Sequence, residues 1–292
     1  MTTLAHLMIS GLVNGSLYVL LTLGLVLVYQ VSGVINFAQG ALAAAGAYLT
    51  WHLSSNVGLS FWLAAALALA IMFVAGLLLQ VLLLKPLRKA PVALSLIVTL
   101  SLVSIIEDAI GQNWGFGSVL FVTPISGAPF RVGGVLVSRI DALTIAVAVV
   151  LTAAFFGAVR WTPAGMMLRA VAQSTSGAQL VGIRVGRVVL VAWGLSTALA
   201  AVAGILIAGQ SFIITPSMAD LYLLSAFAGA VIGGMDSLAG AALSALLIGV
   251  VQNLVAFYVS NLWHDAIVFL LLLAVLLLRP AGLFGHAVQR RV

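Results

Sequence analysis

The chain has 292 residues, of which 64% are hydrophobic and 6% are charged. A soluble domain carries about 25% charged residues, so this composition excludes an ordinary water-soluble fold and indicates a lipid bilayer as the solvent. The net charge of +6 is better explained by basic residues beside membrane spans than by nucleic acid, and we expect no nucleic-acid partner. The absence of cysteine excludes disulfides and thiolate metal sites, and the four scattered histidines indicate no metal or cofactor.

Long apolar runs predict the spans. A helix rises about 1.5 Å per residue, so about 20 apolar residues cross the hydrocarbon. The runs predict an all-α, polytopic membrane helical bundle of about eight or nine transmembrane helices with Gly-interrupted segments. The expected spans are 8–30, 36–53, 61–84, 92–111, 139–159, 187–210, 221–235, 240–260 and 264–279. The seventh is short and glycine-rich, which leaves open a half-helix. No soluble domain or linker is visible, so residues 1–292 are expected to form a single transmembrane domain.

Basic residues gather in three segments that contain no acid. They are Lys85, Arg88 and Lys89; Arg160, Arg169, Arg184 and Arg187; and Arg279, Arg290 and Arg291. The positive-inside rule places all three segments in the cytoplasm. The acids Glu107, Asp108, Asp141, Asp220 and Asp265 fall at the opposite ends, and the pair Glu107–Asp108 is expected to reach the outer face rather than form a relay. A nine-span count satisfies this alternation and puts the N-terminus outside.

The first break in the apolar pattern is 32–40, with the sequence SGVINFAQG. Its glycines permit unusual backbone angles, and its amide side chains can satisfy backbone groups freed inside a membrane protein. Two interpretations stay open. The segment is either a tight polar turn at the membrane face or a functional break near the translocation path. In the second case, Asn36, Gln39 and Gly40 are candidate path residues.

Two connections are long enough to carry structure of their own. Residues 112–138 contain Gly, Pro and Ser throughout, which predicts an extracytoplasmic cap or a short re-entrant element. The cytoplasmic segment 160–187 predicts a short surface helix at 165–173, continued by 177–183 towards a glycine stop. It would either float at the membrane interface or dock as a coupling loop into a cytoplasmic partner. The candidate docking residues are Leu168, Arg169, Ala170, Ala178, Leu180, Gly182 and Ile183.

A second glycine break lies at 231–240, with the sequence VIGGMDSLAG. Paired Gly-interrupted segments in the two halves of a chain point to the pore region in many transporters, so Gly233 and Gly234 join the candidate path. The alternative is ordinary close packing of helices through small residues. Asp236 is expected to be a helix cap rather than an ion ligand.

Four regions resemble the permeases of ABC importers for branched-chain amino acids, specifically the shorter of their two membrane subunits. They are 11–18 (GLVNGSLY) with 33–40 (GVINFAQG), 168–172 (LRAVA) with Gly182 and Ile183, 231–235 (VIGGM) with Gly240, and 278–285 (LRPAGLFG). The sequence departs from many relatives at Gln39 and Ala41, where they have His and Glu. It also departs at Ser176 and Gln179, where they have an acid and an Arg.

The resemblance implies a transport subunit of the inner membrane rather than an enzyme. It implies a second related permease, two cytoplasmic ATPases and an extracytoplasmic solute-binding protein as partners, with membrane lipid around the complex. The chain has no Gly-x-x-x-x-Gly-Lys-Ser/Thr phosphate loop, so ATP hydrolysis would belong to another subunit. Alternatives are a permease of the same family for urea, short amides or another small solute, an ion-coupled carrier, and a passive channel. The predicted span cores lack acids, which argues against ion coupling.

Overall fold

Helices dominate the computed structural model, which describes residues 2–89, 91–125, 128–132, 135–261 and 263–285. Within these residues, six helices are long and apolar enough to cross a membrane. They include α1 (Thr2–Ser32), α3 (Phe61–Leu79, continued by the π-helical turn Gln80–Leu84), α4 (Val92–Trp114), α5 (Arg139–Trp161), α8 (Val185–Ser211) and α10 (Leu238–Tyr258). Shorter helices are α2 (Gln39–Trp51, continued by the π-helical turn His52–Asn56), α9 (Asp220–Gly233) and α11 (Trp263–Leu278).

Each of the nine predicted spans therefore contains a helix, and the prediction of a polytopic helical bundle is confirmed. The seventh span holds a short helix, as expected. Helix α9 has 14 residues, which corresponds to about 21 Å of rise against about 30 Å of hydrocarbon. It is too short to cross the membrane by itself.

Helix α1 forms the centre of the bundle. Its side chains from Leu17 to Val28 are almost all buried, and α5, α8, α9 and α10 pack around it. Close approach to α10 depends on small residues, because the backbone of Gly249 lies directly against Gly15. Packing of small residues is how helices associate closely in membranes, where lipid removes the hydrophobic drive between them.

The connection after α4 contains short strands that the sequence did not predict. These are β1 (Val119–Leu120), β2 (Phe130–Val132) and β3 (Val135–Val137), with β4 (Ile213–Ile214) following α8. Strand β1 pairs antiparallel with β4, and β2 pairs antiparallel with β3. The β1–β4 pairing joins the connection between α4 and α5, at 115–138, to the connection between α8 and α9, at 212–219.

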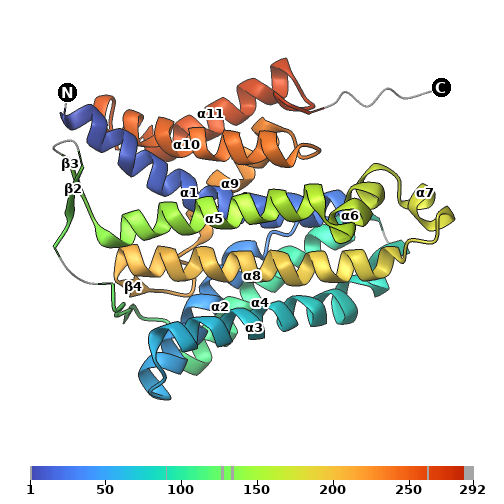
Figure 1. The fold of residues 1–292 in the computed structure, drawn as a ribbon, viewed down its shortest axis with the longest axis horizontal. Coiled ribbons are helices and arrows are strands. Elements are labelled where there is room, and N and C mark those ends of the chain that lie inside the picture. The colour runs from blue at the N-terminus through green and yellow to red at the C-terminus, as the bar shows by residue number, and fades with distance from the viewer. Residues whose placement is uncertain (1, 90, 126–127, 133–134, 262, 286–292) are drawn as a thin grey trace.

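The two ends of the bundle carry different elements. The start of α1 and the β2–β3 hairpin lie at one end, while the short helices α6 (Pro163–Gln173) and α7 (Thr175–Leu180) lie at the other (Figure 1). A 3-10 turn, Pro86–Lys89, joins α3 to α4. Arg290 and Arg291 lie outside the described residues.

Candidate functional site

The first glycine break turns the chain back into the bundle. Helix α1 ends at Ser32, Gly33 adopts a φ of +70°, and α2 begins at Gln39. The Gln39 side chain contacts Ser196, which lies eleven residues after the start of α8 and so about 16 Å along that helix. Helix α2 thus starts inside the protein, which favours a functional break over a turn at the membrane face, and the choice between the two stays a prediction.

A closed network of amides stabilises this start. Asn36 and Gln39 are fully buried. Asn36 Nδ2 donates to Gln39 Oε1 at 3.0 Å, the hydroxyl of Ser196 donates to the same oxygen at 3.0 Å, and Gln39 Nε2 donates to the Ser196 carbonyl at 3.1 Å. Buried amides without partners would cost free energy, so the network allows the chain to break here. In this conformation the two amides bind each other and α8, and their role on the translocation path stays a prediction.

Gly40 lies where the start of a second short helix, α9, contacts the start of α2. A Cβ atom on Gly40 would lie 3.3 Å from the Ala219 carbonyl oxygen and 3.4 Å from Asp220 Oδ1, so the first turns of α2 and α9 are in contact. The carboxyl group of Glu107, on α4, lies near enough to Asp220 for the two acidic groups to interact electrostatically. The expectation that Glu107 reaches the outer face stays a prediction, and Asp220, its neighbour on α9, belongs to the same group of acids.

The second glycine break is a junction with the C-terminal motif. Helix α9 ends at Gly233, and Gly234 has a φ of +100°. The backbone N–H groups of Leu283 and Phe284 donate to the carbonyls of Ile232 and Gly233, at 2.8 and 3.1 Å. These bonds satisfy carbonyls that a helix end leaves without intrahelical partners.

Backbone crowding explains the glycines at this junction. Gly233 lies against the backbone of Gly240 and Ala241, and Gly234 lies against Gly285. The contacts favour the close-packing alternative for Gly233 and Gly234, while their place on the path stays a prediction. The prediction that Asp236 is the helix cap is wrong. Ser237 caps α10, because its side-chain oxygen accepts a hydrogen bond from Gly240 N at 3.1 Å.

The cytoplasmic segment folds into two capped helices rather than one. Thr162 Oγ1 accepts from Gly165 N at 3.1 Å and starts α6. Ser174 is extended, and its hydroxyl oxygen accepts from Gly177 N at 3.0 Å, which starts α7. Gly182, with a φ of +83°, follows α7 as the expected glycine stop. The helical prediction is confirmed, but 177–183 does not simply continue the first helix.

The candidate docking residues divide between two faces. Leu168 and Ala178 are buried in a cluster with Val185 and Trp193 of α8, so they attach the loop to its own bundle. Ala170 and Ile183 are half-buried beside that cluster.

The other face of the loop is open. Leu180 is 89% exposed, and Arg169 is exposed with its guanidinium donating to the Arg160 carbonyl at 3.5 Å. Sequence reasoning missed two further apolar residues there, Met166 and Val181, which are 64% and 74% exposed. The sequence contained a signal for their exposure: Met166 lies off the apolar stripe of α6, and Val181 comes just after α7.

Comparisons with known proteins cover almost the whole chain. The family model described as branched-chain amino acid transport system / permease component matches residues 7–276. The high-affinity branched-chain amino acid transport system permease protein LivH of Escherichia coli K12 is 27% identical, over 98% of this chain and 96% of LivH. The high-affinity branched-chain amino acid transport system permease protein BraD of Pseudomonas aeruginosa is 28% identical, over 98% of this chain and 97% of BraD. A probable branched-chain amino acid transport permease of Methanocaldococcus jannaschii is 32% identical, over 94% of this chain and 90% of that permease.

Proposed function

The chain belongs to the family of branched-chain amino acid transport permeases, and from this membership we propose that it translocates branched-chain or other hydrophobic amino acids as the membrane subunit of an ATP-driven importer. The observation that carries the proposal is a family match over residues 7–276 that contains both glycine breaks and the cytoplasmic loop. The protein is a multi-pass inner-membrane transport subunit and not an enzyme.

The proposal includes partners of the ABC type. ATP hydrolysis requires separate ATPase subunits, since the sequence lacks a phosphate loop. We expect two of them at the end of the bundle that carries α6 and α7, a second related permease beside this one, and a solute-binding protein at the opposite end. This last position would place the binding protein over the β1–β4 and β2–β3 pairings.

Coupling would pass through the α6–α7 segment. The buried face, with Leu168 and Ala178, holds the segment against α8, while the exposed face presents Met166, Leu180 and Val181. Exposed apolar side chains on a short helix are the anchors with which helices bind grooves on partner proteins. Movement of a docked ATPase would be transmitted to α8 because Leu168 and Ala178 pack against residues of that helix.

The candidate path follows the two half-helices. Helices α2 and α9 start beside each other, with Gly40 at the contact. Discontinuous helices supply the substrate sites of many transporters, because their ends expose backbone groups in the middle of the membrane. We therefore place the solute route beside the first turns of α2 and α9.

Reconstitution tests this proposal. The permease would be placed in proteoliposomes with its ATPases, its partner permease and the binding protein, and uptake of radiolabelled leucine, isoleucine, valine, urea and acetamide would be compared. The proposal expects ATP-dependent uptake of the branched-chain amino acids. Uptake of urea or acetamide in preference to them would assign the chain to the other solute class of the family.

A further inference from the structure

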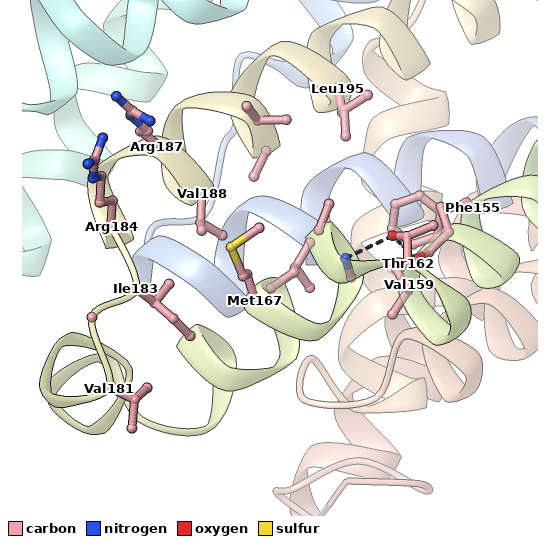
Figure 2. A pocket seen from close by; sticks show the side chains of 17 residues that line it. Phe155, Val159, Thr162, Met167, Val181, Ile183, Arg184, Arg187, Val188 and Leu195 are labelled. Carbon is pink, nitrogen blue, oxygen red and sulfur yellow. Dashed lines mark hydrogen bonds between the residues drawn. The ribbon is translucent and has the colours of Figure 1, made fainter.

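An apolar groove opens between α5, α6 and α8 at the end of the bundle that carries the cytoplasmic loop. Its volume is about 480 Å³, within the range of sites that hold small molecules. Figure 2 shows apolar side chains from all three helices facing this space. Its lining includes Phe155, Val159, Met167, Val188, Val191 and Leu195.

The depth of the groove corresponds to one leaflet. Arg184 and Leu195 both line it and are eleven residues apart, essentially along α8. A helix rises about 1.5 Å per residue, so the lining extends about 16 Å along the helix axis. Half of a typical hydrocarbon core is about 15 Å thick. With Arg184 at the level of the lipid headgroups, as the positive-inside rule predicts, a groove of this length would reach about the middle of the bilayer.

The mouth of the groove is positively charged. Arg184 and Arg187 line it and are exposed, with guanidinium groups that point away from the apolar side chains (Figure 2). Neither arginine forms an ion pair with any residue that the structure describes. The sequence from 160 to 187 contains no acid. The groove thus combines an apolar interior with two cations that have no carboxylate partner on their own segment.

We propose that this groove binds an anionic phospholipid of the cytoplasmic leaflet, with the phosphate at Arg184 and Arg187 and an acyl chain along Val188, Val191 and Leu195. Arginine forms charge-assisted hydrogen bonds with phosphate oxygens, and basic pockets between membrane helices on the cytoplasmic side are suited to lipid headgroups. A free phosphate would leave the apolar interior empty, and a zwitterionic lipid such as phosphatidylcholine would bring a cationic choline group to the two arginines along with its phosphate.

The bound lipid would touch the coupling segment. Met167 of α6 and Ile183, just after α7, line the same groove as the α8 residues. An acyl chain between them would fill the space between the loop and the bundle. Occupancy would therefore stiffen the segment through which the ATPase is proposed to act. The binding itself depends only on the cytoplasmic orientation of the basic residues, not on the transported solute.

The test compares lipid retention by the full-length permease co-expressed with its ATPases. Detergent-solubilised complex would be equilibrated with equal phosphatidylglycerol and phosphatidylcholine, and bound lipid counted by native mass spectrometry. The wild type should retain phosphatidylglycerol preferentially. The double variant Arg184→Gln, Arg187→Gln should lose about thirty-fold in that preference, taking about 1 kcal/mol for each basic residue. Val191→Trp, which fills the groove, should reduce retention of both lipids.

Matched controls separate this site from general effects of charge and bulk. Arg279→Gln removes an exposed basic residue outside the groove, and Ile97→Trp enlarges an exposed side chain on α4. Both should retain lipid as the wild type does. The inference is overturned if the double variant keeps its preference, if glycerol phosphate displaces the lipid at equal concentration, or if Val191→Cys crosslinks to a protein subunit in the assembled complex. Retention is measured without transport, so failure here is distinct from failure of the proposed function.

Discussion

Replacing Leu180 with aspartate would test the exposed face of the coupling loop. The side chain is 89% exposed, so its loss should change the free energy of unfolding by no more than about 0.5 kcal/mol. Full burial of a leucine against a partner contributes about 1.5–3 kcal/mol. Leu180→Asp loses that contribution and places an unpaired charge in an apolar contact. ATPase affinity should therefore fall by at least about ten- to a hundredfold, with normal amounts of permease in the membrane.

The assay is co-purification of the ATPase together with hydrolysis stimulated by the loaded binding protein. Ser176→Asp is the matched control, because it adds the same charge to an exposed position on the same helix without removing an apolar side chain. The family resemblance implies an acid at this position, so this variant should couple normally. Leu168→Asp should behave differently again and lower membrane abundance, since Leu168 is only 8% exposed. Wild-type recruitment and hydrolysis in Leu180→Asp would refute the docking role of this face.

Three further predictions concern the breaks and the orientation. Gly233→Leu should lower uptake far more than Leu277→Ala at an exposed position, because any Cβ at Gly233 meets the backbone of α10. Equal uptake at equal abundance would show that Gly233 is a tolerant turn residue. Gln39→Leu should lower the free energy of unfolding by about 1–3 kcal/mol, because it leaves buried polar groups unpaired. Asn113→Leu, at an exposed site, should leave it unchanged. Identical melting curves for the two variants would contradict the amide network. Arg184→Cys should resist a membrane-impermeant thiol reagent in intact spheroplasts and react after lysis, and labelling from outside would invert the topology.

Hydrophobic run length was sufficient to predict the spans, because a bilayer requires a long apolar segment for each crossing. The two breaks were visible for a local reason as well: Gly33 and Gly234 have positive φ values that other residues rarely adopt. Even the shortness of α9 followed from its interrupted apolar run. Each of these features depends on residues that are neighbours in the sequence, so it could be predicted without knowledge of tertiary contacts.

Long-range contacts could not be predicted in the same way. Gln39 and Ser196 are separated by 157 positions, and no local pattern indicates that they meet. The same holds for Glu107 with Asp220, and for the C-terminal motif that caps α9. Helix periodicity also leaves the inner face of the coupling loop undecided, because apolar residues lie on both faces. Leu168 was therefore expected to contact a partner, whereas it packs on α8.

The energy source of uptake tests the central claim most directly. Proteoliposomes holding the complete complex would be loaded with ATP, and leucine uptake measured with the binding protein outside, with and without ionophores that collapse ion gradients. The account predicts uptake that requires internal ATP, stops when the ATPase is inactivated by mutation, and is unaffected by the ionophores. Uptake that proceeds without ATP and follows an imposed proton or sodium gradient would contradict it.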